Sequence, residues 1–290
     1  MAVVNVMRSF REKPKPLNFV LPGIIAGTVG AIVSPGGAGK SMFALELAAY
    51  KACGVDMTGF CRDADFPLGR VAFLAAEDPP EAIEHRIYAI GQYLAKSLNN
   101  DNACELAMEL IAERVEIESL LGHQIDIQRP DWTQFIESMA TDRSILFLDT
   151  LRRFHVGDEN DSGAMAFVLS ILEGIAQRTN CALVFLHHAS KSAALNGQGD
   201  MQQASRGSSV LTDNVRWQAF ASSMSKPEAI ANGVDDEMRR FHVRCGVSKQ
   251  NYGAPVADVW LKRSEGGVLI PGEFATSYVT MAKPAKEVWK

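Results

Sequence analysis

The chain has 290 residues, enough for one large α/β domain or two small ones, and its 47% of hydrophobic and 22% of charged residues are ordinary for a globular protein. Its 29 basic and 34 acidic side chains give a net charge of −5, which excludes a global basic field that would recruit nucleic acid. The five cysteines form no C-x-x-C pair, and we expect reduced, buried thiols in a cytoplasmic protein.

Residues 1–16 are polar and contain prolines, so we expect a flexible arm here, one domain over 17–275 and a mobile tail over 276–290. The arm has no long apolar segment, which argues against a secretory signal. The apolar stretch Leu17–Val33 is interrupted by Asn18, Pro22 and three glycines, so it is interpreted as a lead-in segment and a strand and not as a membrane span.

A glycine-rich turn between a strand and a helix follows at Thr28–Ser41, TVGAIVSPGGAGKS. This context predicts a phosphate-binding P-loop, because glycines let backbone N–H groups face a phosphate at a helix N-terminus. We expect Lys40 to reach the β- and γ-phosphates and Ser41 to bind Mg²⁺. The strict pattern has glycine where this chain has Ser34. The other expected nucleotide contacts are Gly36, Gly37, Ala38, Gly39 and Met42.

Strands and helices then alternate along the chain. The expected elements are a strand at Arg70–Glu77, helices at Pro79–Lys96, Asp101–Arg114 and Asp131–Ala140, a strand at Ser144–Asp149, a helix at Ser162–Thr179 with Ser162 as its N-cap, and a strand at Cys181–His188. Continuous apolar strands predict a mostly parallel sheet covered by helices on both faces.

The pattern changes after the last of these strands. Residues 189–209 are rich in Ser, Ala, Gly and Gln and form a long loop, which is functional or disordered in a compact domain. Beyond it, strands are expected at Arg216–Ser223, Arg239–Ser248, Val256–Arg263 and Gly267–Pro271. We interpret these four strands as an antiparallel C-terminal extension of the same sheet.

Three polar positions follow apolar strands, as ligand-binding residues do in parallel sheets. Asp149 is placed to hold Mg²⁺, although an aspartate at a strand end also occurs in ordinary turns. Glu77 is placed to polarise the attacking water; the alternative is a cap for the next helix. Of His187 and His188, we favour His188 as a contact to the γ-phosphate, because it is nearer the loop.

Two loops are candidates for contact with single-stranded DNA. In the segment after Asp149, Arg152, Arg153 and His155 would meet phosphates and Phe154 would stack on a base. In the loop 189–209 the candidates are Lys191, Ser192 and Arg206. The alternative for both is a solvent-exposed loop. There is no sequence-reading module, so we expect sequence-tolerant binding that depends strongly on salt.

Long segments of the chain resemble one family. In this order, SPGGAGKS, LAAEDPP, LDTLRRFH, VFLHHASK, QQASRGSSVLTDNVRW and VSKQNYGAP are similar to RepA-type hexameric replicative helicases of IncQ-like broad-host-range plasmids. The resemblance covers roughly residues 17–271 and extends to the RecA-like and DnaB-like P-loop ATPases. It implies a RecA-like core, a homo-hexameric ring with ATP and Mg²⁺ between subunits, and single-stranded DNA in the centre.

The resemblance also implies an arginine supplied by the neighbouring subunit, which neutralises charge on the transferred phosphoryl group. Arg216 is the first choice for this arginine and Arg206 the second; either could instead form a surface ion pair. DnaB-like rings carry a K-x-R pair on a late strand. Here Lys249 is kept and Asn251 stands at the arginine position, which favours Arg216.

The function that follows is an ATP-driven DNA helicase in plasmid replication, with initiator or primase proteins as partners and no membrane association. One alternative is a RecA-like recombination or regulatory ATPase that binds DNA or protein without unwinding. The other is a small-molecule kinase, against which the placement of Glu77 for activating water argues.

Overall fold

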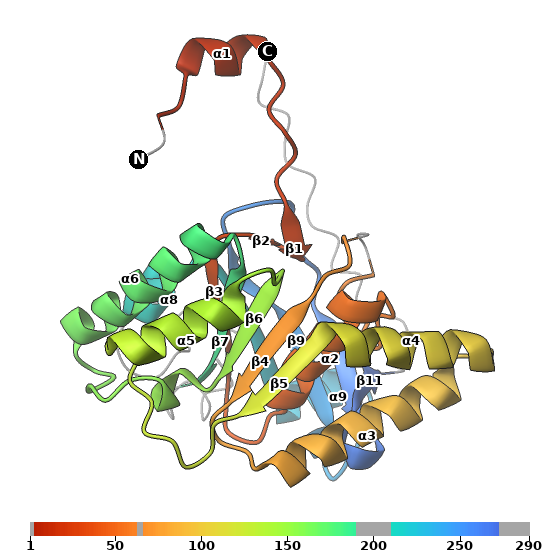
Figure 1. Cartoon of the computed structure of the whole chain (residues 1–290). Coiled ribbons are helices and arrows are strands. Elements are labelled where there is room, and N and C mark those ends of the chain that lie inside the picture. Colours follow the sequence, from red (N-terminus) through yellow and green to blue (C-terminus); the bar gives the residue numbers. More distant parts are fainter. Residues whose placement is uncertain (1–2, 63–65, 190–209, 273–290) are drawn as a thin grey trace.

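The computed structural model describes residues 3–62, 66–189 and 210–272 (Figure 1). In chain order the elements are α1 (Val6–Arg11), β1 (Phe19–Leu21), β2 (Ile24–Ile25), β3 (Val29–Ser34), α2 (Lys40–Cys53), β4 (Val71–Ala75), α3 (Pro80–Ser97), α4 (Asp101–Arg114), β5 (Val115–Ser119), α5 (Pro130–Ala140), β6 (Ile145–Asp149), η1 (Leu151–Arg153), α6 (Ser162–Thr179), β7 (Ala182–His188), α8 (Val210–Asn214), β8 (Trp217–Ser223), α9 (Lys226–Ala231), η3 (Arg239–Phe241), β9 (His242–Gln250), β10 (Val259–Arg263), η4 (Glu265–Gly267) and β11 (Leu269–Pro271).

In the part of the chain that the structure describes, nine strands form the central sheet, in the order β11-β10-β9-β8-β3-β7-β6-β4-β5. The six strands from β8 to β5 run parallel, and β9, β10 and β11 continue the sheet antiparallel. The mostly parallel sheet with an antiparallel C-terminal extension is therefore confirmed. One strand was assigned the wrong direction: β8 is parallel to β3. The Arg216 N–H donates to the carbonyl of Val29 at 3.2 Å, so β8 starts beside the amino end of β3.

Helices cover both faces of the sheet, as expected. Helices α2, α3 and α4 pack on one face, and α5 and α6 pack on the other (Figure 1). Successive residues of β3 alternate between the two cores: Ile32 joins the α2 side and Val33 the α6 side. Because both faces are buried, the strands can be apolar throughout.

Helices α4 and α6 are among those whose first turn is capped by a side chain. Asn100 accepts the Ala103 N–H at 3.2 Å at the start of α4. At α6 the cap is Asp161, whose carboxylate accepts the N–H groups of Gly163 and Ala164 at 2.8 and 3.1 Å. The expectation that Ser162 caps this helix was wrong. Asp161 has the extended backbone of an N-cap residue, whereas Ser162 is already helical.

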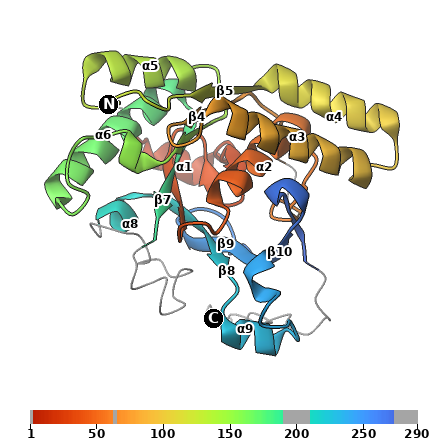
Figure 2. The ribbon, with the colours of Figure 1, turned by 90° about the horizontal axis from the view of Figure 1, so that it is seen from below.

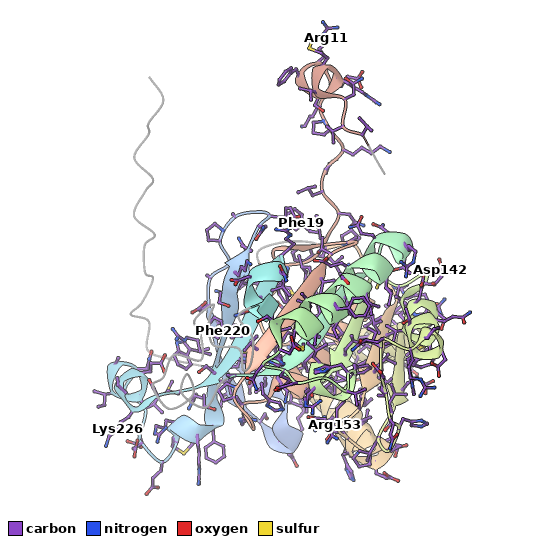
Figure 3. All side chains as sticks on the ribbon, turned by 90° about the vertical axis from the view of Figure 1, so that its left-hand side faces the viewer. Arg11, Phe19, Asp142, Arg153, Phe220 and Lys226 are labelled. Atoms are coloured by element: carbon purple, nitrogen blue, oxygen red, sulfur yellow. The ribbon has the colours of Figure 1, made fainter. Side chains whose placement is uncertain are left out.

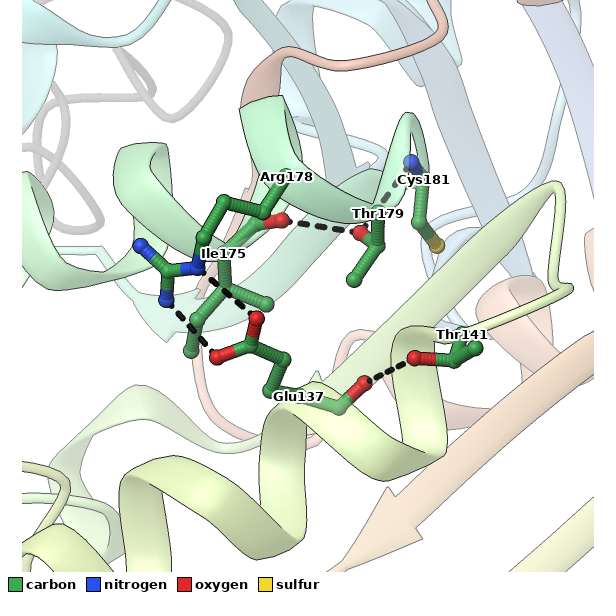
Figure 4. A network of polar contacts seen from close by, with 6 residues as sticks. All are labelled: Glu137, Thr141, Ile175, Arg178, Thr179 and Cys181. Carbon is green, nitrogen blue, oxygen red and sulfur yellow. Dashed lines mark hydrogen bonds and ion pairs between the residues drawn. The ribbon is translucent and has the colours of Figure 1, made fainter.

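An ion pair links the two helices of the second face. Nε and Nη2 of Arg178 on α6 donate to the carboxylate of Glu137 on α5 at 2.7 and 2.8 Å (Figure 4). The guanidinium holds the pKa of Glu137 below its ordinary value. Both groups face water, so the pair orients the helices more than it stabilises them.

The N-terminal segment contains elements that the sequence pattern did not predict. Helix α1 lies within the expected arm and buries none of its residues; Arg11 on α1 and Arg153 lie at opposite ends of the molecule in Figure 3. A hairpin, β1–β2, precedes β3 and is tied to the sheet by Trp217, whose indole N–H donates to the Pro22 carbonyl at 2.8 Å. The edge strand β5 was also not expected.

We predict that Gly30→Ala destabilises the fold. Gly30 lies in β3, and an added Cβ would be 2.7 Å from the Trp217 ring and 2.9 Å from the Ile24 side chain. Overpacking of this kind costs about 1–3 kcal/mol. Urea unfolding measures the loss. Gly91→Ala is the control, because its Cβ would meet only Met108 at 3.6 Å and alanine favours a helix. An equal free energy of unfolding for Gly30→Ala and wild type would contradict the packing described here.

Candidate functional site

The glycine-rich turn has the backbone that a phosphate loop needs. Gly37 and Gly39 adopt left-handed conformations with φ of 75° and 99°, which side-chain-bearing residues rarely adopt. The positions of added Cβ atoms at Gly36 and Gly37 have no neighbour within 4 Å. Ser34 is the buried last residue of β3 and has ordinary strand backbone. The turn therefore does not require the glycine of the strict pattern at that position.

A cavity of about 410 Å³ opens beside this turn. Its walls come from the turn, from the ends of β4 and β7, from α3 and from the β10–β11 hairpin. The lining residues are Gly37, Gly39, Lys40, Ser41, Met42, Glu77, Asp78, Arg86, His188, Arg263, Gly266 and Gly267. Five of the residues expected to contact nucleotide, together with Glu77 and His188, therefore share one cavity.

Asp149 lies at the end of β6 and is only 1% exposed. Burial raises the pKa of its carboxyl to about 6, and a hydrogen bond with Ser41 and the charge of Lys40 oppose the rise. In the described residues, its Oδ1 is buried and has no hydrogen-bond partner. A buried carboxylate with a free oxygen beside a hydroxyl is a donor set that suits Mg²⁺. The residues present therefore fit the metal that the sequence implies.

Glu77 lies just beyond β4, and its carboxylate has neighbours from the segment after β6 and from the end of β7. It accepts the Thr150 hydroxyl at 3.0 Å, Arg153 Nε lies 3.8 Å from Oε1, and His188 Nε2 lies 4.0 Å from Oε2. The alternative interpretation of Glu77 as a helix cap was wrong, because α3 has Pro79 at its N-cap and no side-chain cap. The carboxylate instead faces the cavity that Lys40 lines.

The two histidines at the end of β7 have different environments. His187 is 2% exposed, whereas His188 is half-buried and lines the cavity. Burial, followed by the charge of Lys40, lowers the pKa of His188 below its ordinary value. A neutral imidazole is thus held beside Lys40 and Glu77.

Arg216 and Lys249 lie at the other end of the sheet. Arg216 is exposed beside Val29, the first residue of β3, whereas the glycine-rich turn follows the last residue of β3. Lys249 Nζ donates to the Asp213 carbonyl at 2.9 Å, and Asn251 N–H donates to the Arg216 carbonyl at 3.1 Å. Neither cation lines the cavity of its own chain.

The segment after Asp149 only partly matches the expected DNA contacts. Arg152 and Arg153 are exposed. Phe154 is fully buried in the core on the α5–α6 side, so its expected base stacking was wrong. The chain turns through η1 and inserts this ring between the sheet and the helices. His155 is 4% exposed and was also wrong as a phosphate contact, because its ring faces the interior. Lys191, Ser192 and Arg206 lie outside the described residues.

Four cavity features that the sequence pattern did not single out are Asp78, Arg86, Arg263 and the pair Gly266–Gly267. Asp78 and Arg86 form an ion pair at 2.6 Å. Arg263 and the glycines come from the far C-terminal hairpin, whose turn lies beside α3 (Figure 2). The adjacent glycines were the only local signal, since pairing of β10 with β9 is a long-range contact.

Comparisons with known proteins agree with this fold. Residues 3–194 match the sequence model of an AAA domain (AAA_25). A solved ATPase domain has a similar fold, with a TM-score of 0.60 and 16% identity over 92% of this chain and 96% of that chain. A DnaB-like replicative helicase, solved in a study of its interactions with primase, is also similar, with a TM-score of 0.59 and 16% identity over 86% of this chain and 58% of that chain.

The RadB recombinase is similar as well, with a TM-score of 0.53 and 14% identity over 86% of this chain and 92% of that chain. The expected RecA-like fold class is therefore confirmed. No helix among the described residues is long and apolar enough to cross a membrane.

We predict a pH-dependent stability difference for Asp149→Asn. The folded-state pKa of about 6 lies above the ordinary value near 3.9, so the fold disfavours the ionised carboxylate and the penalty grows as pH rises through 6. Without metal and nucleotide, the free energy of unfolding of the variant relative to wild type should therefore increase by roughly 1 kcal/mol when the pH is raised from 5 to 7.5.

Urea unfolding in a chelating buffer at both pH values measures this gain. Asp142→Asn, on the exposed turn after α5, is the matched control for the substitution itself. If the difference in unfolding free energy between Asp149→Asn and wild type is the same at both pH values, the raised pKa of Asp149 is contradicted.

Proposed function

The chain belongs to the AAA domain family, and from that premise we propose that it is an ATP-hydrolysing DNA helicase of the replicative type. The supporting observation is the cavity at the carboxyl edge of the sheet, where Lys40, Ser41, Glu77 and His188 meet beside Asp149. This set combines a cation that would bind the phosphates, a metal site, a general base and a contact for the γ-phosphate.

Each side chain has a proposed role in hydrolysis. Lys40 binds the β- and γ-phosphates, and the N–H groups of the glycine-rich turn and of Ala38 surround them. Ser41 and Asp149 would hold Mg²⁺, which when bound would neutralise charge on the phosphates. Glu77, oriented by Thr150, takes the proton of the attacking water. His188 stays neutral and hydrogen-bonds near the γ-phosphate.

The site is completed by a second copy of the chain. Arg216 is exposed and lies at the opposite edge of the sheet from its own cavity, with Lys249 beside it. We therefore propose that both reach the nucleotide of the neighbouring subunit in a homo-hexamer. Arg206 stays the second candidate for this role.

Single-stranded DNA is the proposed polymer substrate. Arg152 and Arg153 are the exposed cations after β6 that would bind its phosphates, and Lys191 and Ser192 stay proposals for the loop beyond β7. Arg153 Nε also lies 3.8 Å from the Glu77 carboxylate. In this proposal, DNA that binds Arg153 therefore changes the surroundings of Glu77, the general base of hydrolysis.

The remaining context follows from the resemblance to RepA-type plasmid helicases. It comprises plasmid replication in the cytoplasm with initiator or primase partners, and the division into arm 1–16, ATPase domain 17–275 and tail 276–290. The DnaB-like helicase of the comparison was solved in a study of its interactions with primase, which supports a primase as the partner class.

A recombination-type ATPase is the second candidate, supported by the likeness to the RadB recombinase. It would use the same cavity residues, but it would bind DNA without displacing a strand. The two candidates differ in their assembly, which is a closed ring for the helicase and an open filament for the recombination-type ATPase. A heterologous interface between subunits permits either assembly.

We predict ATP-dependent strand displacement on a forked duplex. Glu77→Gln should reduce hydrolysis about 10²- to 10⁴-fold and abolish displacement, because the amide cannot accept the proton of water. Nucleotide binding should persist, which separates loss of chemistry from misfolding. DNA-stimulated hydrolysis without displacement would reject the helicase in favour of the second candidate. Hydrolysis unaffected by DNA would contradict both.

We predict two effects of Arg153→Gln. Binding to single-stranded DNA should weaken, and the slope of its affinity against salt concentration should fall by the equivalent of about one phosphate contact. Hydrolysis without DNA should rise about two- to fivefold, because the guanidinium no longer competes with the attacking water for the Glu77 carboxylate. Arg152→Gln is the matched control: its guanidinium donates to the His155 carbonyl at 3.2 Å, so only DNA binding should change. Equal DNA-free rates for the two variants would contradict the coupling.

A further inference from the structure

Arg263, the last residue of β10, reaches across the glycine-rich turn of its own chain. Its Nη2 donates to the Gly37 carbonyl at 2.7 Å. The same guanidinium lies 3.3 Å from the position that a Cβ of Gly39 would occupy. Residues 226 positions apart in the chain are thus in contact at the wall of the cavity.

The charge of Arg263 is not neutralised by a carboxylate among the described residues. Its one hydrogen bond there is to the Gly37 carbonyl, which leaves most of the five guanidinium N–H donors without a protein acceptor. Partial burial lowers the pKa of Arg263 below its ordinary value. Arg86, which lines the same cavity, is instead paired with Asp78 at 2.6 Å. Lys40 and Arg263 are therefore the cavity cations still able to bind an anion.

The hairpin that carries Arg263 is anchored to the P-loop helix. The Leu269 N–H of β11 donates to Glu46 Oε1 of α2 at 2.7 Å. Glu46 is 1% exposed, and burial raises its pKa well above the ordinary value. In the turn between the strands, the Ser264 N–H donates to the Val268 carbonyl at 2.7 Å. Helix α2 begins with Lys40, so these contacts fix Arg263 and Lys40 relative to each other.

We propose that Arg263 binds the phosphate chain of the nucleotide held by its own subunit, alongside Lys40. This assignment rests on the proposed nucleotide site and adds a phosphate contact to it. The guanidinium contacts the turn and also lines the cavity, so it can keep its bond to the Gly37 carbonyl and donate its free N–H groups to a phosphate. It differs from Arg216, which lies at the other edge of the sheet and serves a neighbour.

Two other roles for Arg263 make different predictions. A guanidinium could stack on the nucleotide base, in which case a ligand without a base would not sense it. It could also act only as a brace for the turn through Gly37, in which case any substitution would weaken all ligands alike and lower the stability of the free protein. Phosphate binding requires the positive charge itself, and its effect is the same with or without a base.

The test compares wild type with Arg263→Gln, Arg263→Lys and Lys262→Gln in calorimetric titrations with ADP and with pyrophosphate, each with Mg²⁺ at two salt concentrations. Lys262 is the exposed neighbour on the same strand, so its variant removes an equal charge without facing the cavity. Thermal unfolding of each free protein checks the fold.

Phosphate binding predicts that Arg263→Gln weakens ADP and pyrophosphate by the same factor, about 10- to 100-fold, and reduces the salt dependence. Arg263→Lys should recover part of the loss, and Lys262→Gln should stay within about twofold of wild type. A loss for ADP alone would overturn the proposal in favour of base stacking. Equal losses for the Gln and Lys variants with a lower unfolding temperature would overturn it in favour of a brace.

The proposed helicase activity fails separately. If wild type binds both ligands and displaces no strand, the helicase is rejected and the Arg263 contact stands. If wild type binds neither ligand, the nucleotide site and the Arg263 contact are both overturned.

Discussion

The site depends on one constraint: parallel strands in register end at the same edge of a sheet. Ser34 of β3 is paired with His188 of β7, and Ala75 of β4 is paired with Asp149 of β6. The turn that carries Lys40 and the residue Glu77 follow directly from two of these strand ends. Side chains more than 100 positions apart in sequence are thereby brought to one cavity without any long loop being needed to carry them there.

The same topology places a second group of cations at the amino edge. Strand β8 starts beside Val29, and its antiparallel partner β9 ends there, so Arg216 and Lys249 become neighbours. They do not line the cavity of their own chain, because the length of β3 lies between Arg216 and the glycine-rich turn. If these cations serve hydrolysis, the catalytic unit is an interface between copies, and assembly becomes a condition for chemistry.

Local sequence was sufficient for residues that follow strand ends. The glycine-rich turn, Asp149, Glu77 and His188 were each found from an apolar run and the polar residue after it, and the structure brings them together. Local sequence was not sufficient where long-range packing determines the position of a side chain. Phe154 is a hydrophobic side chain in a basic segment, and only the turn through η1 shows that it enters the core.

The direction of β8 was predicted wrongly, and Arg263 was not recognised as a cavity residue, for a related reason. Both depend on strand pairing between distant parts of the chain, which a local pattern of apolar residues does not encode. The positions of the expected strands were found to within three residues, because burial on both faces gives a continuous apolar signal.

The most direct test of the account mixes subunits. Lys40→Ala and Arg216→Ala should each be inactive alone, because one lacks the phosphate cation and the other the arginine given to its neighbour. Mixed together, they should regain hydrolysis at interfaces where an intact Lys40 meets an intact Arg216. A mixture of Lys40→Ala with Glu77→Gln is the control, since both changes lie in the same cavity and no interface is complete. Recovery in the first mixture alone is the predicted result; no recovery in either mixture would contradict a site shared between two copies of the chain.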